Sequence, residues 1–204
     1  MSVLKKISIS LIIVLIALIG VLAYITHKTP KPVQTTSQAI IETPKPPEYV
    51  LDAYITQLAD EVGLDKQILI KAHTGVSPTL ACDNSPTTYG CFSSNTITLR
   101  DTVKQKDRYK QRVALTHEYL HWVYYNKNIQ LKPLLLQVYT QNKGYFDSRF
   151  RSYYANGMKI GDDNFYSELH SFIGTEVSDS KLPPELLEHY LKYTKNRNAL
   201  PSYI

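Results

Sequence analysis

The feature that most constrains this chain is a short stretch inside residues 113–123, which reads His117-Glu118-Tyr119-Leu120-His121. Residues four apart lie on one face of an α-helix, about 5–6 Å apart between Cβ atoms, so both imidazoles can reach one metal ion. Glu118 would lie beside such an ion, where its carboxylate can take a proton from an attacking water and return it to a leaving amine. The alternative is a surface helix that happens to carry two histidines.

A catalytic zinc site needs a third protein ligand, with a fourth position open to water. The spacing that would supply a third histidine is absent, because Tyr124 replaces the expected glycine and Lys127 replaces the expected histidine. A Gly-Thr-x-x-Asp arrangement is also absent, because Asp179 comes one residue late after Gly174-Thr175. A glutamate further along the chain is the remaining source of the third ligand.

Residues 163–176 contain two glutamates and are predicted to form a helix with one apolar face. Glu168 lies at the edge of that face, so it can point inward and still reach a cleft, and we predict it as the third metal ligand. Glu176 lies near the centre of the face, where an unpaired carboxylate is costly. It is the alternative ligand, or a partner to a ligand histidine. His170 projects away from the face and is a weaker candidate ligand.

With His117-Glu118-Tyr119-Leu120-His121 and the later Glu168, the chain resembles the gluzincins, and more narrowly the small single-domain minigluzincins. The resemblance implies a zincin-like α+β fold, with a small mixed sheet packed on the active-site helix and a helical C-terminal half. It implies zinc-dependent hydrolysis of peptide or protein substrates, with Glu118 as general acid and base. The class often has an acidic residue four places after the ligand glutamate, where this chain has Phe172.

The N-terminal residues 1–27 are predicted to form a transmembrane anchor. Within them, Ile7 to Ile25 is an uncharged run of nineteen residues, which as a helix spans roughly 28 Å, close to the thickness of a bilayer core. A cleaved signal peptide is the alternative, although its apolar region is usually shorter. Lys5 and Lys6 favour a cytoplasmic N-terminus. We therefore expect a single-pass protein of the cell membrane with its large domain outside the cytoplasm.

Residues 28–47 are rich in proline and threonine and are predicted to be an extended linker. Residues 48–204 then form the folded domain, a reasonable size for one core. The chain is 43% hydrophobic and 20% charged, with a net charge of +5. The lysines are spread along the sequence without a dense basic block, so nothing indicates nucleic-acid binding. No oligomeric state can be inferred.

The two cysteines, Cys82 and Cys91, bracket a loop rich in turn-forming residues. If the domain lies outside the cytoplasm, we expect them to form a disulfide. Their spacing is not that of a zinc site. Two free thiols in a cytosolic protein are the alternative, so the membrane orientation and the state of the cysteines test each other.

Apolar spacing and breaker residues predict the remaining elements. Residues 67–73 are expected to be extended, with a helix over 65–72 as the alternative. In zinc peptidases an edge strand just before the active-site helix commonly binds extended substrate through its main chain, and the pattern over 90–99 suits that role or an ordinary strand. The other predictions are an amphipathic helix ending at Gly63, a strand–turn–strand over 90–99, a helix capped by Asp107 that runs to about Asn126, and helices over 131–141 and 183–193.

Residues 144–158 are aromatic and basic. Tyrosines packed into a small core are the favoured interpretation, and a substrate-pocket wall is the alternative. A peptidase also needs a donor for the transition-state oxyanion. Tyr190 is predicted for that role ahead of His189 and Arg197, although ordinary helix packing would explain all three.

The sequence therefore predicts a membrane-anchored zinc metallopeptidase. The main alternative is a non-catalytic cell-surface binding module whose metal site is structural or degenerate. A weaker alternative is a quality-control peptidase that faces the cytosol, which reduced cysteines would favour.

Overall fold

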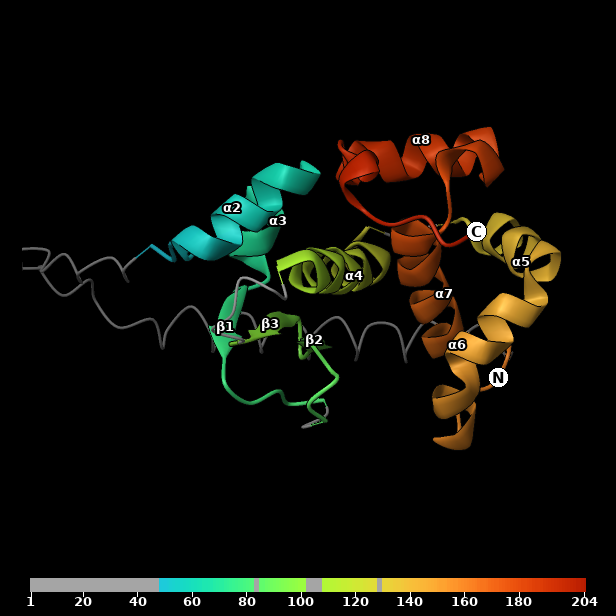
Figure 1. Cartoon of the computed structure of the whole chain (residues 1–204), viewed down its shortest axis with the longest axis horizontal. Helices are drawn as coiled ribbons and strands as arrows, with labels where there is room; N and C mark the ends of the chain where they lie inside the picture. Colours follow the sequence, from blue (N-terminus) through green and yellow to red (C-terminus); the bar gives the residue numbers. More distant parts are fainter. Residues whose placement is uncertain (1–47, 83–84, 102–107, 128–129) are drawn as a thin grey trace, which may run out of the picture. The chain divides into compact units, whose positions relative to one another are not determined.

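One long helix, α4 (Arg108–Asn126), lies between a small sheet and a second group of helices (Figure 1). The computed structural model describes residues 48–82, 85–101, 108–127 and 130–204. The predicted transmembrane anchor over 1–27 and the linker over 28–47 lie outside these residues. Among the helices of the described part, none is both long and apolar enough to cross a bilayer.

The domain begins with two helices, α2 (Ala53–Val62) and α3 (Lys66–Lys71). As predicted, α2 ends at Gly63, which has a φ of +72° that glycine adopts without steric strain. The extended structure predicted for 67–73 is wrong, and the helical alternative is confirmed. Asp65 explains this, because its side chain accepts a hydrogen bond from the Gln67 N–H and caps a helix too short to show helical periodicity.

The sheet has three strands in the order β1-β3-β2. The strands β2 (Gly90–Ser93) and β3 (Thr96–Arg100) pair antiparallel, which confirms the predicted strand–turn–strand. The turn residues Ser94 and Asn95 both have positive φ, the geometry of a tight two-residue hairpin. The third strand, β1 (Gly75–Ser77), pairs parallel with β3 and was not predicted. In the sequence its three residues look only like a break between elements.

The C-terminal half is helical, as expected. Helix α7 (Asp163–Glu176) packs against α4 and crosses it, with the sheet on the other side of α4 (Figure 1). The two helices approach so closely that a Cβ on Gly174 would lie 2.3 Å from Leu120 Cδ1. The surrounding elements are α5 (Lys132–Gln141), α6 (Lys143–Ala155), the 3-10 turn η2 (Asp179–Lys181), α8 (Pro184–Tyr193) and the 3-10 turn η3 (Arg197–Ala199). The domain is therefore α+β, with a small mixed sheet.

The aromatic stretch over 144–158 lies mostly within α6 and has two functions. Phe146 and Phe150 are fully buried in the core, as the packing interpretation predicts. Tyr153 is only partly buried and borders a cleft. The predicted cap at Asp107 lies outside the described residues, but α4 ends at Asn126 as expected.

Candidate metal centre

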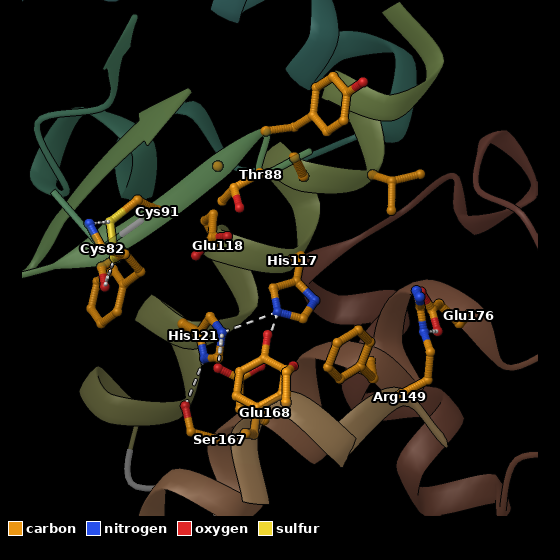
Figure 2. A pocket seen from close by; sticks show the side chains of 18 of the residues that line it. Cys82, Thr88, Cys91, His117, Glu118, His121, Arg149, Ser167, Glu168 and Glu176 are labelled. Carbon is orange, nitrogen blue, oxygen red and sulfur yellow. Dashed lines mark hydrogen bonds and ion pairs between the residues drawn. A yellow bond between two sulfur atoms is a disulfide. The ribbon is translucent and has the colours of Figure 1, made fainter. Parts of the chain in front are cut away.

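A cleft of about 1260 Å³ lies between the β2 side of the domain and the helices α4, α6 and α7 (Figure 2). His117, Glu118 and His121 reach it from α4, and Glu168 reaches it from α7. Glu118 lies on the side of the cleft near Cys91 and Thr88, and Glu168 lies opposite. The helix with the two histidines therefore borders the cleft.

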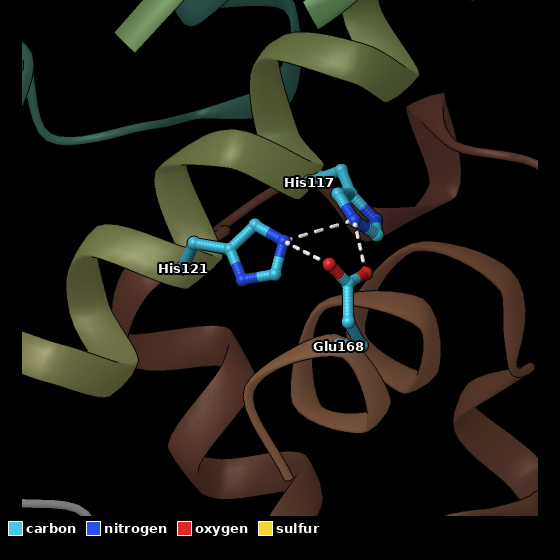
Figure 3. Close-up of side chains that lie close together, drawn as sticks. All are labelled: His117, His121 and Glu168. Carbon is cyan, nitrogen blue, oxygen red and sulfur yellow. Dashed lines mark hydrogen bonds and ion pairs between the residues drawn. The ribbon is translucent and has the colours of Figure 1, made fainter. Parts of the chain in front are cut away.

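The three predicted metal ligands come together although Glu168 is far from the histidines in sequence (Figure 3). His117 Nε2 lies 3.1 Å from His121 Nε2 and 3.3 Å from Glu168 Oε2. His121 Nε2 lies 3.5 Å from Glu168 Oε1. In the described part of the chain, these three residues form the one group of potential ligands whose donor atoms converge.

The spacing of these atoms fits a zinc ion. Donors at about 2.0–2.1 Å from a tetrahedral zinc lie about 3.3 Å from one another. The observed separations of 3.1, 3.3 and 3.5 Å bracket that value. Two imidazoles and one carboxylate are also a donor set used by catalytic zinc. Both the spacing and the chemical nature of these three side chains therefore fit a zinc ion.

The hydrogen-bond partner of His121 supports the same assignment. Ser167, which is buried, places its Oγ 2.7 Å from His121 Nδ1. If the Nδ1–H donates a hydrogen bond to this oxygen, Nε2 carries the lone pair that can bind a metal. Burial lowers the pKa of His121 to about 4, so the ring is neutral, as a metal ligand must be. The sequence analysis did not identify Ser167, whose only signal is its position before Glu168.

Glu118 is held by the sheet. Gly90 of β2 lies against its side chain, so closely that a Cβ on that glycine would be 2.8 Å from Glu118 Cγ. Burial raises the pKa of Glu118 to about 7, while nearby His117 opposes the rise and the carboxylate of Glu168 adds to it. A carboxyl with a pKa near neutrality is well suited to accept and then return a proton.

Tyr153 is a cleft residue that the sequence analysis assigned to a stretch of core tyrosines. Burial tends to raise the pKa of Glu168, and the Tyr153 hydroxyl is one of the neighbouring groups that lower it. Burial raises the pKa of Tyr153, so its hydroxyl stays protonated and remains a donor. The pocket-wall alternative is therefore correct for this one tyrosine.

The structure does not bring Tyr190 to the cleft. Tyr190 is fully buried, and its hydroxyl donates to the carbonyl oxygen of His170 at 2.8 Å. The Nε2 atom of His189 lies 2.9 Å from the Nε2 atom of His170. Arg197 donates a hydrogen bond to the carbonyl oxygen of Gly174. None of the three predicted oxyanion donors borders the cleft. The packing interpretation explains them, because α8 lies against the far side of α7.

His170 does not border the cleft, in keeping with its expected direction away from the apolar face of α7. It is fully buried against α8, so the outer side of α7 is also covered. The expectation for Glu176 needs correction. Glu176 is buried at the centre of the apolar face, as predicted, but its partners are Arg149 and Tyr145 and it does not contact a ligand histidine. The sequence offers no signal for this pairing, because Arg149 and Tyr145 lie on a different helix.

The disulfide between Cys82 and Cys91 is present, as predicted, with the Cα atoms 5.7 Å apart. Both residues border the cleft, and Cys91 lies within β2 (Figure 2). Thr87, Thr88 and Tyr89, within the loop that this bond closes, border the cleft as well.

Comparison with protein-family models, with curated proteins and with solved structures found no match to this chain.

Proposed function

We propose that the domain is a zincin-like, zinc-dependent metallopeptidase in which His117, His121 and Glu168 hold the metal. The observation that carries this proposal is the convergence of these side chains at the spacing of a zinc site, with Glu118 beside them in an open cleft. A zinc ion held there supplies Lewis acidity, which polarises a carbonyl and makes water a nucleophile at neutral pH.

Glu118 is the general base and then the general acid of the proposed reaction. Its carboxylate, packed against Gly90 of β2, takes a proton from the attacking water and delivers it to the leaving amine. Tyr153 takes the role that was predicted for Tyr190. Its protonated hydroxyl, placed beside Glu168, is a donor for the oxyanion of the transition state.

The strand β2 provides a place for the substrate backbone. It is an edge strand, because its one strand partner among the described residues is β3. Gly90, Cys91 and Phe92 all border the cleft. An extended peptide laid along this edge would be held through main-chain hydrogen bonds, which do not depend on its side chains.

The alternative function, a binding module with a structural metal site, would need the fourth metal position to be filled by the protein. Within the described ranges the converging ligand group has three members, and it faces the cleft. An open fourth position favours catalysis. The disulfide supports the further proposal that the domain lies on the oxidising, extracytoplasmic side of a membrane.

Two measurements test the proposed function. The full chain, purified without chelator, should contain close to one zinc per molecule, and Glu168→Ala should lose it. Glu118→Gln should keep the zinc but lower peptide hydrolysis by roughly 10²–10⁴-fold. Glu188→Gln, at an exposed position on α8, is the matched control and should change neither property. A folded chain without zinc, or full activity in Glu118→Gln, would refute the proposal.

The role of Tyr153 has its own test. Tyr153→Phe should reduce kcat by roughly 10²-fold, the usual loss for one oxyanion donor, while zinc content stays unchanged. Tyr154→Phe removes the neighbouring hydroxyl, which does not border the cleft, and should leave kcat unchanged. Equal kcat values in the two variants would exclude Tyr153 as the donor.

A further inference from the structure

An arginine and a buried glutamate form one end of the cleft, beyond His117. Arg149 Nε donates to Glu176 Oε2 at 2.9 Å, and Arg149 Nη2 donates to Glu176 Oε1. Tyr145 adds a third hydrogen bond to the same carboxylate at 2.6 Å. Figure 2 shows the pair together on the side of the cleft away from Ser167.

The two partners differ sharply in exposure. The side chain of Glu176 is 2% exposed, whereas that of Arg149 is 43% exposed. Glu176 uses the edge of the planar guanidinium formed by Nε and Nη2. The end formed by Nη1 and Nη2 therefore points away from Glu176, with two further parallel N–H groups. Such a pair of donors matches the two oxygens of a carboxylate.

The guanidinium lies within substrate reach of the metal centre. The Arg149 Cζ is 5.1 Å from the centre of the Phe172 ring, which in turn is 4.6 Å from the centre of the His117 ring. These two spacings put the guanidinium within about 10 Å of His117. Two residues of extended peptide span roughly 7 Å. A group one or two residues from the scissile bond can therefore contact Arg149.

The direction of β2 indicates which end of a peptide arrives there. The strand starts at Gly90, against Glu118, and continues to Phe92, whose ring stacks on His121 at 6.1 Å. Arg149 lies toward the starting end, beyond His117. A peptide paired antiparallel with β2, the slightly more stable arrangement, runs in the opposite direction. Its C-terminal part then points toward Arg149.

We propose that Arg149 binds a carboxylate of the substrate, one or two residues after the scissile bond. This inference rests on the proposed peptidase function for the identity of the substrate. The carboxylate is either the C-terminus of a short peptide or the side chain of an aspartate or glutamate. In both cases Glu176 is the positioning residue, because its buried carboxylate holds the guanidinium at the end of the cleft.

Binding and hydrolysis of matched peptides test this assignment. The probes are a fluorescent hexapeptide with a free C-terminal carboxylate, the same peptide as its amide, and the amide with aspartate at the penultimate position. Dissociation constants are measured by fluorescence anisotropy on the zinc-loaded full chain carrying Glu118→Gln, and kcat/KM is measured with Glu118 present. The free acid should bind about 10–100-fold more tightly than the plain amide, the usual range for hydrogen bonds to a charged group.

The variants separate recognition from stability. Arg149→Met combined with Glu176→Gln removes both charges, so no buried carboxylate is left unpaired, and should bring the acid-to-amide ratio close to one. Arg149→Lys keeps the cation beside Glu176 but loses the parallel N–H pair, so it should fold and show a smaller ratio. Arg151→Met is the matched control, because Arg151 is exposed on the same helix and does not border the cleft. It should keep the full ratio.

The outcomes are distinguishable. Tight binding of the free acid alone identifies the C-terminal carboxylate, and equal binding of the aspartyl amide identifies an acidic side chain; both support the role of Arg149. The proposal fails if wild-type protein binds all three peptides equally, or if the ratio persists in both Arg149 variants. Arg149-dependent binding without hydrolysis of any probe would count against the peptidase function and would leave standing only the binding of a carboxylate by Arg149, without its place relative to a scissile bond.

Discussion

Replacing Gly90 by alanine should impair catalysis without removing the metal. A Cβ at this position would lie 2.8 Å from Glu118 Cγ, 3.1 Å from Glu118 Oε1 and 3.3 Å from Ala114 Cβ. Carbon atoms in contact prefer about 3.5–4.0 Å, so the overlap with Glu118 is about 1 Å. Gly90 is not among the residues with positive φ, so alanine brings no backbone strain there. The substitution therefore acts through the position of the Glu118 carboxylate.

The expected loss of catalytic rate follows from the displacement of the Glu118 carboxylate. A shift of about 1 Å in a catalytic group can reduce the rate by about 10²-fold. We expect Gly90→Ala to lower kcat/KM by that order, and to lower the free energy of unfolding by about 1–3 kcal/mol through overpacking. The metal ligands are not touched by the new methyl group, so zinc content should remain that of the wild type.

The assay compares Gly90→Ala with Gly144→Ala. No atom lies within 4 Å of a Cβ built on Gly144, which is in helix α6. This control should keep full activity and gain up to about 1 kcal/mol of stability from helix propensity. Peptide hydrolysis, zinc content and circular dichroism are measured on all three proteins. A folded, zinc-loaded Gly90→Ala protein with wild-type kcat/KM would show that β2 does not position Glu118.

Three further predictions concern stability. Replacing Cys82 and Cys91 by serine should lower the free energy of unfolding by about 2–3 kcal/mol, the value for a disulfide that closes a loop of this length. A denaturant titration that shows no loss of stability would contradict a disulfide in the purified protein. Gly174→Ala should lower the free energy of unfolding by about 1–3 kcal/mol, because the new Cβ would meet Leu120 Cδ1. This loss outweighs the better helix propensity of alanine. An unchanged melting temperature would mean that α4 and α7 are further apart than described. Burial, with a smaller contribution from Lys192, lowers the pKa of His189 to about 4. As the pH falls below about 6.5, His189 is therefore protonated in the unfolded chain before it is protonated in the folded one. Stability is lost between about pH 6.5 and pH 4 for this reason. His189→Gln should remove that part of the acid sensitivity, by at most roughly 3 kcal/mol at pH 4, and identical pH profiles of unfolding for the two proteins would refute the buried neutral state.

The parts of the candidate site that the sequence and the structure arrange alike depend on local geometry. His117, Glu118 and His121 are related by one turn of a helix, so their arrangement follows from their spacing. Glu168 was predicted from its position at the edge of an apolar helical face, and the structure places it beside both histidines. In these cases the secondary structure of one segment is enough to orient the side chain.

The parts that the sequence does not predict depend on how separate segments pack. Tyr153 borders the cleft together with Glu168, although the two residues lie on different helices, and nothing in the spacing of its neighbours distinguishes it from the other tyrosines. Tyr190 lies on an amphipathic helix, but only the packing of α8 shows that its buried face meets the far side of α7. The strand β1 exists because β3, twenty residues later, offers a parallel partner.

The proposed metal ligands come from two helices that are widely separated in the chain, since the histidines lie on α4 and Glu168 lies on α7. A metal ion bound there is a cross-link between them that the unfolded chain does not have. By mass action, each tenfold rise in free metal above its dissociation constant adds about 1.4 kcal/mol to the free energy of unfolding. The lifetime of the folded domain would then depend on the free zinc concentration of its compartment, and scarcity of the metal would remove the protein as well as its activity.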